Sequence, residues 1–311
     1  MSNMRAVVVS RDAPSGLALA DVETPVPAPS EALVRVAAIG LNRGEVRGVR
    51  TAAAGSRIGW DFAGTVERAA ADGSGPAAGT RVLGLLEGGA WAELLAVPTR
   101  AAATLPDAVT FSQAATLPLA GLTAWVALEK AGGLLQRNVL VTGASDGGGY
   151  FAVQLAREGG AHVVAQVRTA DSVELVRAAG AHEVVVGAEA ADHGKYDLIV
   201  DSIGGTALAS LMTQLAPDGL VVAYLASSDA ALTIDLRSFL AMGGLRLYGM
   251  TIFYELRQVA PRVGLTRLAA LVATGRLRTS IAAEASWNAI DSVAQAMLES
   301  GHSGKTVLLV D

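Results

Sequence analysis

Several glycines stand between a short apolar run and an apolar helical pattern near the middle of the chain, and together they could bind a phosphate group. Residues 139–141 form an apolar run typical of a strand buried on both faces. Gly143 and residues 147–149 follow, and apolar residues then recur at helical spacing. Such a turn brings backbone N–H groups and the positive end of a helix dipole close to an anion. We expect a diphosphate to bind at four residues of this turn: Ser145, Asp146, Gly147 and Gly148.

Asp146 is the unusual member of this turn, because a carboxylate repels a diphosphate unless it turns to solvent or is neutralised. Gly147, Gly149 and Ala152 give a literal dinucleotide-binding spacing, but residues 142–146 separate it from the strand. Three outcomes stay open at this stage: Asp146 is a tolerated neighbour, it weakens cofactor affinity, or it abolishes cofactor binding.

Strand and helix patterns alternate around this turn. The strand patterns cover residues 139–141, 162–167, 183–186, 198–201, 220–224 and 245–249. The helical patterns cover residues 121–131, 149–158, 170–179 and 207–215. This alternation predicts an α/β fold with a doubly wound parallel sheet, whose ligand lies across the carboxyl ends of the strands. Three residues follow or end these strands and should face that ligand: Arg168, Ser202 and Leu225.

The first part of the chain is β-rich instead. Short strand patterns at residues 6–9, 32–38, 64–68, 81–86 and 92–97 are separated by glycine and proline, which predicts a partly open antiparallel barrel. Near the end, helical patterns at residues 262–274 and 289–300 precede a last strand pattern at 306–310. A lone strand must pair with something, so we expect it to return to the barrel. The active site would then be the cleft between the two parts.

Composition narrows the class of protein. The chain has 311 residues, 51% hydrophobic and 17% charged, with a net charge of −5 and no basic run, which argues against a nucleic-acid partner. No apolar run approaches the ~20 residues of a membrane span, and the N-terminus lacks a signal-peptide layout, so we expect a cytoplasmic protein. There is no cysteine, and no two of the four histidines have metal-ligand spacing, so we expect no metal site.

Several short blocks, in their order and spacing, resemble one known superfamily. They are residues 40–42, 58–64, 79–82, 89–93, 115–124, 200–205 and 303–307. The chain resembles the medium-chain dehydrogenase/reductase superfamily, and within it the zinc-independent branch of quinone oxidoreductases and enoyl reductases. The resemblance implies a GroES-like catalytic domain (residues 1–120 and 256–311), a Rossmann domain (121–255), NADPH as hydride donor and a homodimer.

The resemblance also implies roles for individual residues. Asn42 and Arg47 would face the substrate, Thr123 would start the helix that faces the nicotinamide, and Phe253 would close over it. Lys305 would reach a phosphate or the ribose. Relatives usually have valine where this chain has Gly148, and we expect the glycine to loosen the turn so that Asp146 turns away. Residues 60–62 are expected to belong to the barrel core and a turn rather than to the site.

Arg168 decides the preference between cofactors. An acidic residue near this strand end holds the ribose 2′-hydroxyl in NAD-binding sheets, whereas an arginine suits a 2′-phosphate, so NADPH is expected. Without a zinc Lewis acid, a conjugated acceptor such as a quinone or an α,β-unsaturated carbonyl takes hydride more readily than an alcohol gives it up. Two alternatives stay open: an enoyl reductase acting on a thioester or polyketide intermediate, and a reductase-like binding protein without redox activity.

Overall fold

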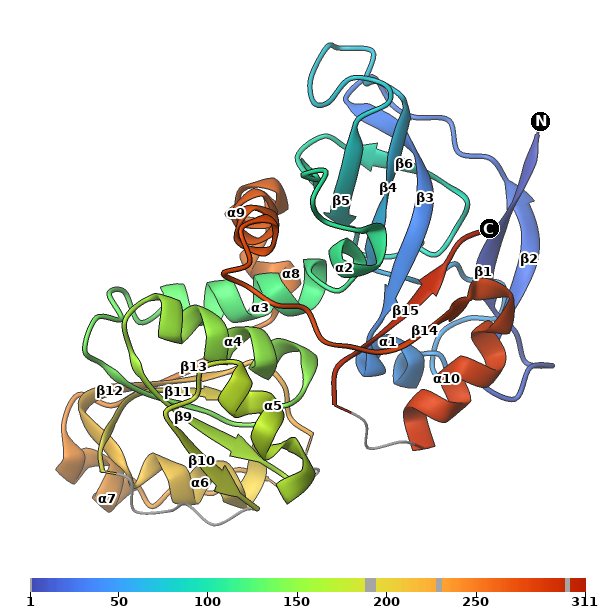
Figure 1. Cartoon of the computed structure of the whole chain (residues 1–311). Coiled ribbons are helices and arrows are strands. Elements are labelled where there is room, and N and C mark those ends of the chain that lie inside the picture. The colour runs from blue at the N-terminus through green and yellow to red at the C-terminus, as the bar shows by residue number, and fades with distance from the viewer. Residues whose placement is uncertain (1, 188–193, 228–230, 300–302) are drawn as a thin grey trace. The chain divides into compact units, whose positions relative to one another are not determined.

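The computed structural model describes residues 2–187, 194–227, 231–299 and 303–311. The chain splits into two compact units (Figure 1). The β-rich unit comprises Met1–Leu122 and Val259–Asp311, and the parallel-sheet unit comprises Thr123–Gln258. Each is described by itself.

Two sheets form the β-rich unit. Strands β1 (Asn3–Val9) and β2 (Leu17–Glu23) make a two-stranded antiparallel sheet. The larger sheet has the order β14-β15-β3-β4-β5-β7, and β6 also pairs with β3. Its strands are β3 (Glu31–Leu41), β4 (Asp61–Arg68), β5 (Arg81–Leu85), β6 (Leu94–Pro98), β7 (Ala102–Thr104), β14 (Ile281–Ser286) and β15 (Lys305–Leu309). The last strand therefore returns to the β-rich unit as expected, with Val307 opposite Gly40 in an antiparallel pair.

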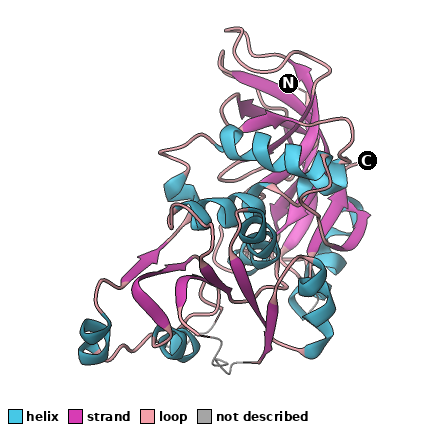
Figure 2. Ribbon diagram, turned by 60° about the vertical axis from the view of Figure 1, so that its left-hand side comes forward, coloured by secondary structure: helices cyan, strands magenta, loops and turns pink. Residues whose placement is uncertain are grey.

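The helices of this unit are α1 (Arg43–Gly48), α2 (Phe111–Ala115), α9 (Pro261–Ala273) and α10 (Ile290–Glu299). Helix α3 (Pro118–Glu129) crosses from this unit into the next. The sequence patterns did not predict α1, β2, β7 or β14. The core of the unit is built around aliphatic strand residues and two fully buried tryptophans, Trp91 and Trp287. Strands hold more of this unit's described residues than helices do, and they are drawn as magenta ribbons in Figure 2.

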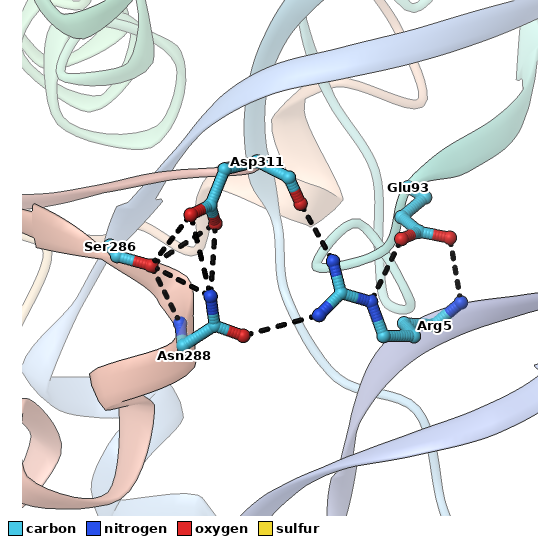
Figure 3. Close-up of polar contacts among 5 residues, drawn as sticks. All are labelled: Arg5, Glu93, Ser286, Asn288 and Asp311. Carbon is cyan, nitrogen blue, oxygen red and sulfur yellow. Dashed lines mark hydrogen bonds and ion pairs between the residues drawn. The ribbon is translucent and has the colours of Figure 1, made fainter.

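A polar cluster fastens both ends of the chain to the β-rich unit (Figure 3). Arg5 Nε donates to Glu93 Oε1 at 2.9 Å, and the Arg5 backbone N–H donates to Glu93 Oε2 at 2.8 Å. The guanidinium also donates to the Asp311 backbone oxygen at 2.7 Å and to Asn288 Oδ1 at 3.2 Å. One side chain on β1 thus contacts Glu93 just before β6, Asn288 in the short turn after β14, and Asp311.

The parallel-sheet unit has the strand order β10-β9-β8-β11-β12-β13, with every pairing parallel. The strands are β8 (Asn138–Val141), β9 (His162–Val167), β10 (Glu183–Val186), β11 (Tyr196–Asp201), β12 (Leu215–Ala223) and β13 (Arg246–Gly249). The helices are α4 (Gly147–Glu158), α5 (Val173–Ala178), α6 (Gly205–Met212), α7 (Leu236–Met242) and α8 (Ile252–Glu255). Helices α4 and α6 lie on opposite sides of this sheet (Figure 1), so the expected doubly wound fold is confirmed.

The direction of strand addition reverses between β8 and β11, which are hydrogen-bonded neighbours. A sheet of this kind binds its ligand at that switch point, beyond the carboxyl ends of the strands. The turn with the glycines follows β8 directly and therefore lies at this edge. Among the described residues, no helix is long and apolar enough to cross a membrane.

Candidate functional site

The glycine turn contains two glycines, Gly143 and Gly149, whose backbones lie too close to other atoms for a side chain to fit. Gly143 has φ 57°, in the left-handed region that favours glycine. A Cβ on Gly143 would lie 2.3 Å from the Ser202 Oγ atom, and a Cβ on Gly149 would lie 2.3 Å from the Gly143 backbone oxygen. Both positions therefore admit only glycine without rearrangement. The first turn of α4 is held directly against the end of β8, with its free N–H groups at the ligand edge of the sheet.

A buried polar network joins this turn to the end of β11. Thr142 Oγ1 donates to Asp201 Oδ1 at 2.8 Å, and the backbone N–H of Gly204 donates to Asp201 Oδ2 at 2.9 Å. The backbone N–H of Ser202 donates to Thr142 Oγ1 at 2.9 Å, and Ser202 Oγ donates to the Thr142 backbone oxygen at 3.2 Å. Burial raises the pKa of Asp201, and the hydrogen bonds from Thr142 and Gly204 offset part of that rise. The network fixes the spacing of β8 and β11 where a ligand would lie.

Asp146 is the N-cap residue of α4 and is exposed. Its backbone is extended (φ −84°, ψ 164°), and its side chain makes no capping hydrogen bond with the helix. Its backbone N–H donates to the Gly143 oxygen at 2.9 Å. The residue is exposed to water, while its Oδ2 atom lies 3.6 Å from the position of a Cβ on Gly143, so the carboxylate stays beside the anion-binding turn. Its effect on affinity stays a prediction.

Gly148 lies beside the side chain of Tyr224. Its φ is not positive, so the backbone does not require glycine there. A Cβ on Gly148 would lie 3.1 Å from the Tyr224 hydroxyl oxygen and 3.3 Å from Tyr224 Cε2. The expectation that Gly148 loosens the turn stays a prediction; the structure adds that the Tyr224 ring occupies the space beside it. Sequence reasoning missed Tyr224; the exchange of valine for glycine at position 148 was the signal that another side chain fills this space.

The other expected cofactor residues of this unit lie at different depths. Arg168 directly follows β9 and is exposed, and Ser202 is 3% exposed beside the glycine turn. Leu225 lies two residues beyond the end of β12 and is 51% exposed. Thr123 is buried inside α3, which begins at Pro118, so the expectation that Thr123 starts a helix is wrong. Phe253 is a half-buried residue of the short helix α8.

In the β-rich unit, Asn42 and Lys305 meet in a buried cluster with two carboxylates. Lys305 Nζ donates to Asn42 Oδ1 and, at 3.0 Å, to Asp61 Oδ2. Asn42 Nδ2 donates to Asp61 Oδ2 at 2.9 Å and to Glu45 Oε2 at 2.6 Å. The backbone N–H of Leu119 donates to Asp61 Oδ1 at 2.8 Å. Asp61 is thus buried, as expected of residues 60–62, but its carboxylate also orients both predicted site residues.

This cluster, defined by Asn42, Glu45, Asp61 and Lys305, contains two carboxylates and one ammonium. Lys305 contacts Asp61, and Glu45 lies on the other side of Asn42. Burial raises the pKa of Glu45 well above its usual range, and the neighbouring Asp61 carboxylate raises it further. Glu45 Oε1 is buried without a hydrogen-bond partner. The raised pKa favours the neutral form of Glu45 beside the ion pair of Asp61 and Lys305. Sequence reasoning missed Glu45, because helix α1, which places it beside Asn42, was not predicted either.

Arg47 lies apart from these contacts. It belongs to the last turn of α1, and its side chain is exposed. Asn42 is the N-cap of the same helix. The structure therefore brings Asn42 together with Lys305, whereas Arg47 faces solvent. Among the described residues, no group of three His, Cys, Asp or Glu side chains could hold a metal ion.

Comparison with known proteins agrees with this architecture. A family model described as "Alcohol dehydrogenase GroES-like domain" matches residues 28–107, and one described as "Zinc-binding dehydrogenase" matches residues 147–264. The chain is 30% identical over 241 residues to a chloroplastic quinone-oxidoreductase homolog of Spinacia oleracea, covering 70% of this chain and 73% of that protein. A solved structure of an alcohol dehydrogenase superfamily protein from Novosphingobium aromaticivorans has a TM-score of 0.87 and 29% identity, covering 99% of this chain and 100% of that one.

The mitochondrial NAD(P)H oxidoreductase RTN4IP1 of Bos taurus is 40% identical over 129 residues, which is 38% of this chain. The chain matches only 32% of the length of that relative. The fold, with its glycine turn at the switch point of a parallel sheet, agrees with the GroES-like and dehydrogenase domains that the two family models describe. The chain belongs to the medium-chain dehydrogenase/reductase family, in its quinone oxidoreductase branch.

Proposed function

We propose that this protein is an NADPH-dependent reductase that delivers hydride to a quinone or an α,β-unsaturated carbonyl compound without zinc. The observation that carries the proposal is the glycine turn at the β8–β11 switch point, with the exposed Arg168 at the end of the neighbouring strand β9. A helix N-terminus at this edge binds a diphosphate, and an arginine after the second strand suits a 2′-phosphate.

The residues present fit a dinucleotide. The space that a side chain on Gly143 or Gly149 would need is taken by other atoms, so the α4 N-terminus and the end of β8 are in direct contact. Ser145–Gly148 would hold the diphosphate, Arg168 the 2′-phosphate, and Ser202 would lie beside them. The bound nicotinamide supplies the hydride.

The buried cluster of the β-rich unit suits a site that works without a metal. Both N–H groups of the Asn42 amide are used by Glu45 and Asp61, and its Oδ1 atom accepts from Lys305, so its orientation is fixed. We expect this fixed amide to form one wall of the substrate site. Zinc ligands of the cysteine type are impossible because the chain has no cysteine. A conjugated acceptor spreads the negative charge that hydride addition creates, and the exposed Arg47 guanidinium could donate to the acceptor oxygen.

Oxidation of NADPH, followed by its absorbance, tests this proposal directly. We expect turnover with a simple quinone or enone, and a lower affinity for NADPH in Arg168→Ala with little change for NADH. Loss of a hydrogen-bonded ion pair between Arg168 and the 2′-phosphate should lower the affinity for NADPH by roughly tenfold or more. Equal losses for the two cofactors in Arg168→Ala would refute the role assigned to Arg168.

Asp146 provides the test against a cofactor-free role. Calorimetry of NADPH binding to the wild type and to Asp146→Gly distinguishes a reductase from a protein without cofactor. Binding of NADPH to the wild type supports the reductase, and tighter binding by Asp146→Gly measures the repulsion from the carboxylate. If only Asp146→Gly binds NADPH, the wild-type turn is disabled and the reductase proposal fails. Turnover restricted to an enoyl thioester, with no activity on quinones, would favour the enoyl reductase alternative.

We also propose that the protein is a homodimer joined through the edge strand β13. Supporting this, β13 and the neighbouring helix α7 carry exposed apolar side chains, among them Leu236, Leu240 and Leu247. An unpaired edge strand with apolar neighbours is a surface that proteins usually cover. Light scattering of the wild type and of Leu247→Lys checks this, since a dimer should become a monomer. A cytoplasmic location stays a prediction.

A further inference from the structure

The most informative unassigned contact is the one between Gly148 and Tyr224. Gly148 has no conformational need to be glycine, because its φ is not positive. The atoms nearest to the position of a Cβ on Gly148 all belong to Tyr224: the hydroxyl oxygen at 3.1 Å, Cε2 at 3.3 Å and Cζ at 3.4 Å. Glycine at 148 therefore provides the space in which the end of the Tyr224 side chain lies. A tyrosine hydroxyl thus stands beside the first turn of α4.

Tyr224 is held in this position from two directions. Its backbone N–H donates to the Asp201 oxygen at 3.0 Å, which ties the residue to the end of β11. Its hydroxyl is hydrogen-bonded to the Ser202 side chain, whose own Oγ donates to the Thr142 backbone oxygen. Because Ser202 Oγ already donates its proton to the Thr142 oxygen, the Tyr224 O–H is available as a donor toward Ser202.

The Tyr224 hydroxyl keeps its proton. Burial raises the pKa of Tyr224 far above its ordinary value, and the nearby carboxylates of Asp146 and Asp201 raise it further. The group is therefore a neutral O–H donor throughout the physiological range. Rotation about the Cζ–O bond can turn this proton from Ser202 toward an acceptor placed at the first turn of α4.

An anion at this turn needs such a donor. The N-terminus of α4 attracts a diphosphate, but Asp146 places a carboxylate immediately beside it. A neutral hydroxyl adds attraction at the same turn without adding charge. We propose that Tyr224 is a diphosphate-binding residue whose hydroxyl donates to the cofactor and offsets the repulsion from Asp146, and that Gly148 is glycine in order to admit it. This inference rests on the proposed function, because it assumes that a dinucleotide binds at the turn.

Binding of NADPH, ADP and adenosine to the wild type and to Tyr224→Phe tests the assignment. Phenylalanine keeps the ring beside Gly148 and removes only the hydroxyl. Loss of a hydrogen bond to a charged group lowers binding affinity by about tenfold or more. We expect that loss for NADPH and ADP, and no change for adenosine, which lacks phosphate. Tyr196→Phe is the matched control, because Tyr196 is a buried tyrosine at the opposite end of the same sheet, and it should bind all three ligands as the wild type does.

The outcomes separate this inference from the proposed function. If the wild type binds NADPH and ADP but Tyr224→Phe binds them equally well, the role of Tyr224 is overturned and the reductase proposal stands. Equal losses for ADP and adenosine would also overturn it, because the effect would then be general to the pocket. If the wild type binds none of the three, the reductase proposal and this inference both fail.

A second variant tests the packing itself. Gly148→Ala places a Cβ 3.1 Å from the hydroxyl oxygen in the wild type, which is tighter than an ordinary contact. In the Tyr224→Phe background that oxygen is gone, so alanine at 148 should lower the melting temperature less than it does with Tyr224 present. An equal decrease in both backgrounds would mean that Gly148 and Tyr224 are not coupled, and the structural basis of the assignment would be lost.

Discussion

Replacing Glu45 by glutamine should change how the stability of the β-rich unit depends on pH. Burial and the Asp61 carboxylate raise the pKa of Glu45 in the folded state, whereas in the unfolded chain it stays near 4.5. Below that value both states hold the proton and pH has no effect through this group. Above it, the unfolded state releases the proton and the folded state keeps it, so the free energy of unfolding falls as pH rises, until the folded pKa is passed.

The magnitude follows from the proton count. When only the folded state holds the proton, the free energy of unfolding falls by about 1.4 kcal/mol for each pH unit between the unfolded and folded pKa values. Glutamine cannot ionise, and its amide oxygen can still accept from the Asn42 amide as Glu45 Oε2 does at 2.6 Å. We therefore expect Glu45→Gln to be more stable than the wild type at pH 7 to 8, and the advantage to shrink steadily toward pH 5.

Urea unfolding at a series of pH values, followed by tryptophan fluorescence, measures this difference. Three of the four tryptophans, Trp60, Trp91 and Trp287, belong to the β-rich unit, so the signal reports mainly on it. Glu87→Gln, an exposed glutamate of the same unit, should follow the wild type at every pH. A constant difference between wild type and Glu45→Gln from pH 5 to 8 would refute the claim that Glu45 is neutral in the folded state.

Three further substitutions test other contacts. Lys305→Met leaves the buried carboxylate of Asp61 without its cation, and we expect a loss of roughly 3–5 kcal/mol in urea unfolding; a loss below about 1 kcal/mol would contradict the ion pair. Gly149→Ala places a Cβ 2.3 Å from the Gly143 oxygen, and a cost of about 1–3 kcal/mol should appear as a lower melting temperature, whereas an unchanged value would show that the turn yields easily. Arg5→Ala removes the three hydrogen bonds of a partly exposed side chain and leaves the backbone N–H bond to Glu93, and we expect a loss of only about 1 kcal/mol by denaturant midpoint; a much larger loss would refute the exposed character of this cluster.

Local patterns predicted the strands of the parallel-sheet unit because most of them contain a short apolar run, but they did not predict helices α7 and α8. The run at residues 139–141 lies within β8, which begins one residue earlier. The pattern at residues 162–167 has the same bounds as β9. The β-rich unit was harder. Four of the seven residues of β2 are half-buried and only Leu17 is buried, and three of the six residues of β14 are exposed, so neither carries a strong apolar pattern.

The sites divide in the same way. A glycine turn is encoded by neighbours in sequence, so the region 143–149 could be found by inspection. The cluster around Asn42 could not be found in this way, because its members are distant in sequence. Lys305 is 263 positions from Asn42, and Asp61 is 19 positions from it. Tyr224 is hidden for the same reason: its contact with Gly148 depends on the pairing of β8, β11 and β12, which no local pattern specifies.

The return of β15 to β3 has a consequence for how the protein is made. The β-rich unit is discontinuous: Met1–Leu122 leaves the ribosome first, yet its sheet lacks β15 until Lys305–Leu309 has been synthesised. The parallel-sheet unit is one continuous segment between the two segments of the β-rich unit. It can therefore complete its fold before β15 is available to the β-rich unit. During that interval the edge of β3 that later receives β15 is open to other strands, which makes it the point at which a chaperone would be needed or aggregation would begin.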